Sequence, residues 1–161
     1  MSLRNDFIHA MSRAAATVSV VTTDGPGGRA GVTVSAMTSV SADGEAPTML
    51  VCVNEGGSAT GPILTNRRFA INVLEAGQQD LADIFAGRTG AADRFEGVEW
   101  SPGATGAPIL PGLASFDCDL QQSDLIGTHH VLIGAVREVR VRETGSPLIY
   151  GMRSYLKAEK A

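Results

Sequence analysis

The sequence has few of the residues that bind nucleic acids and no long apolar run. It contains 13 Lys and Arg against 17 Asp and Glu, and its only lysines, Lys157 and Lys160, lie near the C-terminal end. A nucleic-acid surface needs clustered Lys and Arg, so we expect no nucleic-acid partner. A membrane-spanning helix needs about 20 consecutive apolar residues. No such run is present, so we expect no membrane association either.

Cysteine is also scarce, with Cys52 and Cys118 far apart and neither in a CxxC pair. We therefore expect both to be small buried residues. This usage fits a reducing compartment. Charged and polar residues at positions 4–6 interrupt any apolar N-terminal region, which argues against a signal peptide. We expect a cytoplasmic protein.

The motifs of several common enzyme classes are missing. There is no GxGxxG and no GxSxG, and Ser58 is followed two positions later by Thr60 rather than glycine. The three histidines, His9, His129 and His130, lack the spacing of a zinc site. The residues thus give little support to a hydrolase, and we expect no metal site.

Alternating β-branched residues and frequent turn residues predict a fold rich in β-strands. Of the 161 residues, 43% are hydrophobic, which is enough for a single domain over 1–161 with a real core. The 19 glycines indicate many turns and close backbone approaches. Helical spacing predicts a helix over 3–14. Strands are expected over 16–23, 31–41 and 48–53, with turns between them. The strand over 48–53 is almost wholly apolar, so we expect it to be buried on both faces.

Elements of the same kind continue along the chain. We expect Ser58 to cap a short helix that has Pro62 in its first turn. A strand over 69–74 and a helix that Gly87 ends come next. A long loop over 88–112 follows, of a kind that is usually functional or packed against a partner. The remaining expected elements are strands over 113–122, 129–142 and 148–150, and then a polar tail.

This order predicts a mainly β fold with short helices, arranged as a small antiparallel β-barrel. It does not have the βαβ order of a doubly wound sheet. Small polar loops flank the predicted strands at 33–39, 54–60, 85–87 and 127–129. Such loops suit a bound cofactor that performs the chemistry itself. The alternative for the run Gly31–Ser41 alone is an ordinary half-buried strand rich in Ser and Thr.

At these four stretches the chain resembles the flavin reductase family, which has the FMN-binding split-barrel fold. Members of that family include the small reductase components of two-component flavin-dependent monooxygenases. The resemblance extends from Phe7 to Gly151 and implies an antiparallel Greek-key split β-barrel. The matching segments are Val20–Thr23, Gly31–Ala36, Ser39–Ser41, Leu50–Asn54, Ser58, Asn72–Leu74, Phe85–Gly87, Gly127–His129 and Leu148–Tyr150.

The resemblance implies a role for each matching part of the chain. The strand Thr33–Met37 lies along the flavin ring and meets it with its backbone, whereas Ser39 and the turn 54–60 hold the ribityl chain and phosphate. The segment 85–87 closes over the flavin, and His129 is the catalytic residue near the nicotinamide. The implied cofactor-binding residues are Thr33, Val34, Ser35, Ala36, Met37, Ser39, Cys52, Val53, Asn54, Ser58, Ala59, Thr60, Phe85, Ala86, Gly87, His129, Tyr150 and Arg153.

Some of these residues have structural alternatives. Ser58 is also suited to a plain helix cap, and Phe85 is equally suited to the core. Tyr150 and Arg153 are assigned to the nicotinamide nucleotide, although Arg153 could be an exposed residue of the tail. His130 departs from the small or apolar residue expected beside His129, and it could face the other side of the strand.

The implied activity is NAD(P)H-dependent flavin reduction, in which hydride passes from C4 of nicotinamide to N5 of FMN, or of FAD. Reduced flavin would then reach a partner monooxygenase by diffusion. Family members are usually homodimers with the flavin near the subunit interface. The alternatives are a non-catalytic flavin carrier or sensor and a specialised reductase on the same fold, for example one acting on a corrinoid.

Overall fold

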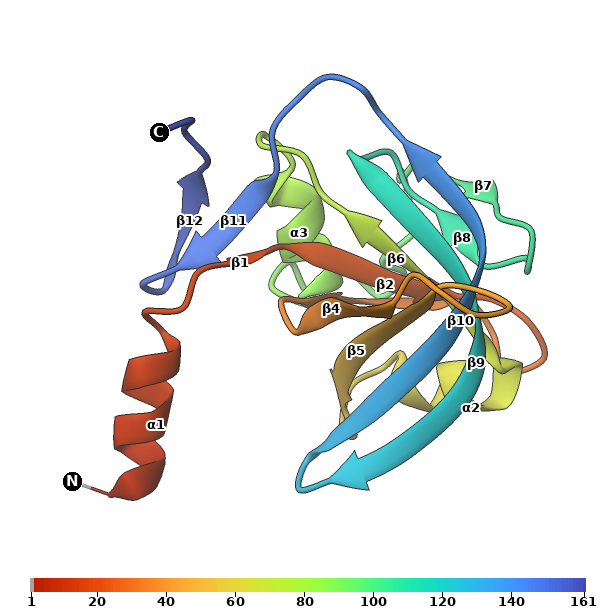
Figure 1. Ribbon diagram of the computed structural model, residues 1–161, viewed down its shortest axis with the longest axis horizontal. Helices are drawn as coiled ribbons and strands as arrows, with labels where there is room; N and C mark the ends of the chain where they lie inside the picture. The colour runs from red at the N-terminus through yellow and green to blue at the C-terminus, as the bar shows by residue number, and fades with distance from the viewer. Residues whose placement is uncertain (1) are drawn as a thin grey trace.

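The structure, a computed structural model, describes residues 2–161, which form a mainly antiparallel β fold with three short helices (Figure 1). The helices are α1 (Leu3–Met11), α2 (Thr60–Asn66) and α3 (Gln79–Phe85). The strands are β1 (Ala16–Thr17), β2 (Ser19–Thr23), β3 (Ala30–Val34), β4 (Met37–Ser41), β5 (Thr48–Asn54), β6 (Arg68–Val73), β7 (Ser101–Pro102), β8 (Pro108–Ile109), β9 (Ala114–Ile126), β10 (His129–Val141), β11 (Leu148–Gly151) and β12 (Ser154–Lys157).

Seven strands form one curved sheet in the order β3-β2-β6-β9-β10-β5-β4. Its two edge strands, β3 and β4, are consecutive in the chain and are joined only by Ser35 and Ala36. The chain therefore steps directly from one edge of the sheet to the other, so the sheet curls into a barrel with a seam between β3 and β5 (Figure 1). The backbone N–H of Cys52 bridges this seam, donating to the carbonyl of Ala36 at 3.0 Å.

The expected single strand over 31–41 is thus two strands. A continuous strand could have paired with only one side of the sheet, whereas the break at Ser35–Ala36 lets its two halves pair with β2 and β5. The expectation for 48–53 also needs correction. In β5 the side chains of Met49, Val51 and Val53 are buried, but Leu50 and Cys52 on its other face are only partly buried.

The barrel interior is filled by apolar side chains from all the central strands, including the fully buried Phe69, Ile71 and Leu132. Cys118 belongs to this cluster, as expected from its sequence context. Burial raises the pKa of its thiol to about 12. Because the thiolate is the reactive form of cysteine, Cys118 is a packing residue.

A second cluster joins α3, the segment 88–112 and the C-terminal hairpin. The segment 88–112 carries the short hairpin β7–β8, and it buries Phe95 and Leu110 against its own chain. The segment 88–112 is therefore packed against the barrel of its own chain and covers the second core cluster. The expected polar tail is also ordered, because β12 pairs with β11 and extends a small sheet that begins with β1.

Helix α1 ends at Met11, one turn earlier than expected from the sequence. It has no buried residue, and it stands apart from the barrel in Figure 1. Its own Ser2 caps it by accepting a hydrogen bond from the backbone N–H of Asn5 at 3.2 Å. Local capping and helical spacing therefore define α1, but tertiary packing within the chain does not.

Candidate functional site

A pocket of about 220 Å³ opens at the seam between β3 and β5. It is lined by Val32, Thr33, Val34, Ser35 and Ala36 on one side, and by Cys52, Asn54 and His129 on the other. Because β3 is an edge strand, its backbone can offer hydrogen bonds to a ligand in place of a neighbouring strand. No side chain from 32 to 36 is larger than valine, so a flat ring can approach that backbone closely.

Helix α3 supports the strand that forms this wall. The hydroxyl of Thr33 donates to the carbonyl of Ala82 at 2.7 Å. The ring of Phe85 lies directly against Gly31, where an added Cβ would come within 2.7 Å of two ring carbons. Phe85 is fully buried and also packs edge-on against Phe95, with ring centroids 5.0 Å apart. Phe85 therefore takes the core position that was its alternative role, and its ring lies behind this wall. The closing of the segment 85–87 over a flavin stays a prediction.

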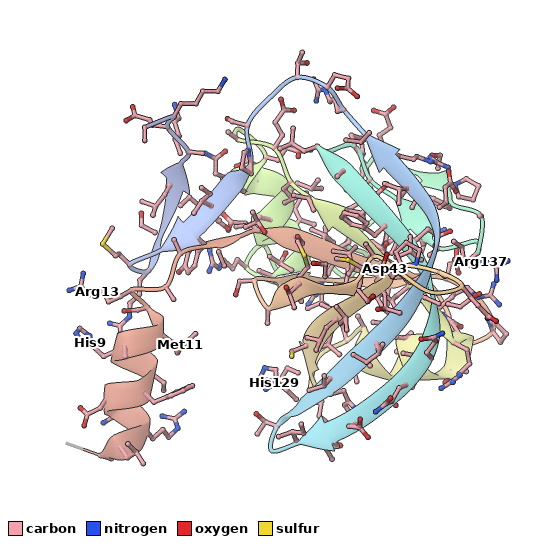
Figure 2. The ribbon with its side chains drawn as sticks, in the orientation of Figure 1. His9, Met11, Arg13, Asp43, His129 and Arg137 are labelled. Atoms are coloured by element: carbon pink, nitrogen blue, oxygen red, sulfur yellow. The ribbon has the colours of Figure 1, made fainter. Side chains whose placement is uncertain are left out.

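His129 lies at the start of β10, opposite Asn54 of β5. Its Nδ1 lies 3.0 Å from the hydroxyl of Thr128, which restrains the orientation of the imidazole. The ring is exposed at the pocket, near the tip of the β9–β10 hairpin (Figure 2). His130 is mostly buried, and its Nε2 lies 3.9 Å from a carboxylate oxygen of Glu55. Of the two histidines, only His129 lines the pocket.

Hydrogen bonds make the turn after β5 rigid. The side-chain carbonyl of Asn54 accepts from the N–H of Gly56 at 2.8 Å, and the hydroxyl of Thr60 donates to the backbone carbonyl of Asn54 at 2.6 Å. The N–H of Glu55 donates to the carbonyl of Thr128 at 2.9 Å. The turn over 54–60 and the loop that carries His129 are thus joined into one unit.

Ser58 does not cap a helix, contrary to expectation. Helix α2 begins at Thr60 with Ala59 as its N-cap, and no side chain makes a capping hydrogen bond. Ser58 instead lines a neighbouring pocket of about 370 Å³ together with Arg29 and Arg94.

The two arginines of this pocket have different surroundings. The Arg94 guanidinium donates to the carbonyls of Gly31 and Phe85, at 3.1 and 2.8 Å, so it holds the barrel wall to the end of α3. Arg29 stacks over the rings of Phe95 and Trp100, with centroid distances of 5.3 and 4.9 Å. Arginine is well suited to binding a phosphate. Sequence reasoning missed both residues because only the packing of the segment 88–112 brings them beside Ser58.

Two further pockets share residues of the same wall. One of about 180 Å³ is lined by Thr33, Val34 and Ser35 together with Val18, Ala86, Arg88, Tyr150 and Tyr155. The other, of about 370 Å³, is lined by Ser35, Ala36, Tyr150, Gly151 and Arg153 together with the end of α1 and the segment after it. Tyr150 lines both. Sequence reasoning placed Tyr150 and Arg153 here but missed Arg88 and Tyr155, the latter because β12 was interpreted as a tail.

The other implied cofactor contacts lie outside these pockets. Val53, Ala59 and Thr60 have buried side chains. Met37 and Ser39 lie on β4, after the connection Ser35–Ala36 that joins the two edge strands of the sheet. Gly87 follows α3 with a φ of 76°, a conformation that favours glycine, and so helps to end the helix. Their roles toward a cofactor stay predictions.

Between residues 2 and 161 there is no group of three or more His, Cys, Asp or Glu side chains that could hold a metal ion. None of the helices in that range is long and apolar enough to cross a membrane.

Comparison with known proteins agrees with the family resemblance seen in the sequence. The family described as "Flavin reductase like domain" matches residues 11–159. The FMN reductase (NADH) RutF of Stutzerimonas stutzeri strain A1501 is 43% identical over 154 residues, which cover 95% of this chain and 87% of that protein.

Solved structures show the same fold. BorF, the flavin reductase component of a bacterial two-component tryptophan halogenase, aligns with a TM-score of 0.87 and 30% identity over 98% of this chain and 99% of its own. A homologue of nitrilotriacetate monooxygenase component B from Mycobacterium thermoresistibile aligns with a TM-score of 0.88 and 26% identity over 97% of this chain and 87% of its own. The chain therefore belongs to the flavin reductase like domain family.

Proposed function

We propose that this chain is an NADH-dependent FMN reductase that supplies reduced flavin to a partner oxygenase. The pocket at the barrel seam carries the proposal, because it combines an open strand edge with a wall of small side chains. The sequence similarity to an FMN reductase (NADH) supports it, and so does the structural likeness to a reductase component of a two-component halogenase.

The residues at the seam fit a flavin. The backbone of β3 can meet the polar edge of an isoalloxazine ring, while Val32, Val34 and Cys52 give its faces apolar contacts. Ser58 and Arg29 line the adjoining pocket and would take the FMN phosphate. When bound, FMN would supply the redox chemistry by accepting a hydride from nicotinamide.

The side chains lining the pocket mainly bind and orient. His129 is held near Thr128 at the pocket mouth, where it would position the nicotinamide. Tyr150 and Arg153 line the pocket beside it and would contact the rest of the nucleotide. Hydride transfer needs close approach and exclusion of water more than a strong acid or base. The lack of an acid–base pair at the seam fits this requirement.

Steady-state oxidation of NADH and NADPH with added FMN, FAD or riboflavin tests the activity. We expect flavin-dependent oxidation, with FMN and NADH preferred. If no flavin stimulates oxidation of either nucleotide, the reductase proposal fails. A protein that binds flavin but never oxidises NADH or NADPH would instead be a carrier or sensor.

Thiol labelling tests the location of the flavin without any turnover. Cys52 is partly exposed in the seam pocket, whereas Cys118 is buried. Burial raises the pKa of the Cys52 thiol, so labelling will be slow but measurable. We expect saturating FMN to slow labelling of Cys52, with Cys52→Ser as the control for residual reaction at Cys118. If FMN leaves the labelling rate of Cys52 unchanged, the flavin does not bind in the seam pocket.

Arg29 provides a test of where the phosphate lies. Arg29→Met keeps a long apolar side chain to pack on Phe95 and Trp100 but removes the charge. We expect the KM for FMN to rise by roughly tenfold, the effect of losing about one charge-assisted hydrogen bond, while the KM for riboflavin stays unchanged. An equal rise for both flavins would show that Arg29 acts only through the packing of the segment 88–112.

We also propose that the protein is a homodimer in which α1 packs against the second copy. Leu3, Phe7 and Met11 share one face of the helix and are 85%, 64% and 54% exposed. An isolated helix of nine residues is unstable in water, so this face needs a cover. The end of α1 also lines one of the pockets, so a partner there would lie beside the flavin site.

Light scattering coupled to size exclusion gives the oligomeric state directly. We expect a dimer that Phe7→Ser weakens, and a monomeric wild-type protein would refute the proposal. The cytoplasmic location expected from the sequence stays a prediction.

A further inference from the structure

Arg88 lies outside the stretches that resemble flavin-binding segments, yet it lines the pocket of about 180 Å³ beside the seam. Its Nη1 donates to a carboxylate oxygen of Asp83 at 2.9 Å. The hydroxyl of Tyr155 donates to the same oxygen at 2.6 Å. The Arg88 guanidinium also lies 5.9 Å from the centroid of the Tyr155 ring. Asp83 thus holds both residues in place at the end of α3.

The remaining N–H groups of Arg88 are free to bind a ligand. Its side chain is 54% exposed, and only Nη1 makes hydrogen bonds among the described residues. Tyr155 is a stable hydrogen-bond donor, because burial and the nearby Asp83 raise the pKa of its hydroxyl to about 12. Tyr155 packs edge-on against Tyr150, with ring centroids 5.4 Å apart. The whole assembly therefore presents one cation and one aromatic face to the pocket.

The position of this pocket limits what it can bind. It shares Thr33, Val34 and Ser35 with the seam pocket, so its occupant would lie next to a flavin bound in the seam pocket. Its volume is below the roughly 300 Å³ at which pockets for a whole small ligand begin. It would therefore take one part of a larger ligand. The pocket that shares Ser35 and Tyr150 with it would take another part.

We propose that Arg88, positioned by Asp83 and Tyr155, binds the pyrophosphate of NADH and so selects a dinucleotide over a bare nicotinamide nucleoside. This inference rests on the proposed reductase function. A guanidinium pairs well with phosphate oxygens, and the adjacent Tyr150 gives a ring surface on which the nucleotide can pack. Asp83 and Tyr155 are positioning residues, since neither needs to touch the nucleotide.

The test compares NADH with reduced nicotinamide riboside, which carries the same hydride donor but no phosphate. For Arg88→Met we expect the KM for NADH to rise by roughly tenfold, the loss of about one charge-assisted hydrogen bond at a half-exposed site. We expect kcat, the KM for the riboside and the Kd for FMN to stay within twofold of wild type. Arg88→Lys should restore most of the NADH affinity, because lysine keeps the charge.

Arg137→Met is the matched control. Arg137 is 60% exposed and pairs with Asp119 at 2.8 Å, much as Arg88 pairs with Asp83, but it lies on the far side of the barrel from His129 (Figure 2). We expect no change in any of these constants for this variant. Tyr155→Phe keeps the ring and loses the bond to Asp83. It should raise the KM for NADH by a smaller factor than Arg88→Met and leave the riboside unaffected.

Three results would overturn the inference. An increase in the FMN Kd with an unchanged KM for NADH would assign Arg88 to the flavin. An equal increase in KM for NADH and for the riboside would show that Arg88 has only a structural role. Unchanged constants would show that Arg88 does not contact the nucleotide. If wild-type protein oxidises no NADH, the proposed function fails separately. In that case, equilibrium binding of NADH to the wild-type protein and to Arg88→Met, measured by NADH fluorescence, decides whether Arg88 binds the nucleotide.

Discussion

Replacing Gly31 with alanine should displace the strand that forms the wall of the seam pocket. The new Cβ would lie 2.7 Å from two ring carbons of Phe85, against 3.4 Å or more for an ordinary contact. The ring would have to retreat by about 0.7 Å. It is fully buried against Phe95 and cannot do so freely.

The expected magnitude follows from two opposing terms. Forcing a methyl group into a packed core costs about 1–3 kcal/mol. The lower flexibility of alanine in the unfolded chain returns about 0.4–1 kcal/mol. We expect a net loss of about 1–2 kcal/mol in the free energy of unfolding, or a fall of about 2–8 °C in Tm for a chain of this size. Because β3 moves, the FMN Kd should rise as well.

Thermal unfolding of Gly31→Ala, Phe85→Leu and the double variant tests this mechanism. Leucine lacks the ring edge, so alanine at position 31 should be neutral or slightly stabilising in the Phe85→Leu background. An equal loss of stability in both backgrounds would refute the steric explanation. Gly61→Ala is the control, because no residue other than its chain neighbours lies within 4 Å of an added Cβ at Gly61 in α2. Alanine there should change the free energy of unfolding by less than about 1 kcal/mol, since the helix propensity of alanine is offset by the clash of its Cβ with the following Pro62.

Three further predictions concern other parts of the fold. His129→Ala should slow flavin reduction by at least about tenfold, measured by stopped flow, while the FMN Kd from equilibrium titration changes much less. Unchanged reduction kinetics would show that His129 has only a structural role. Thr33→Val removes the hydrogen bond to Ala82 and should lower the free energy of unfolding by about 1 kcal/mol, measured by urea denaturation. Burial raises the pKa of Asp117, which accepts hydrogen bonds from Thr105. The folded state therefore holds that proton more tightly, so wild-type stability falls as pH rises from about 4, the usual value, through the raised pKa. Asp117→Asn should gain stability relative to wild type over that window in urea unfolding series, and a pH-independent difference would contradict this.

Elements with strong local signals could be predicted from the sequence. The strand expected over 69–74 is β6, and the helix that Gly87 was expected to end is α3. Repeated side-chain spacing and a glycine stop are local properties, which survive in almost any tertiary context. The family resemblance also placed the seam residues Thr33–Ala36 and His129 beside one another, as the pocket now shows.

Elements that depend on distant partners could not be predicted in this way. The alternation of small polar and apolar residues over 31–41 continues through Ser35 and Ala36, and no residue there signals a break. The strand must nevertheless break there to reach both sheet edges. The segment that forms β12, Ser154–Lys157, is too short to carry a strand signal of its own, and it becomes a strand by pairing with β11. Ser58 has the chemistry of a helix cap, but the helix begins two residues later.

The sequence by itself therefore determined the class of fold, the positions of most strands and the small residues that let a flat ring approach β3. Their types and spacing are local, and they carry the family resemblance. Only the tertiary structure decided that Phe85 lies behind the wall, and that Arg29, Arg88 and Tyr155 face the pockets beside it. Those placements depend on how the segment 88–112 and the C-terminal hairpin pack on the barrel. No pattern within a single segment records such packing.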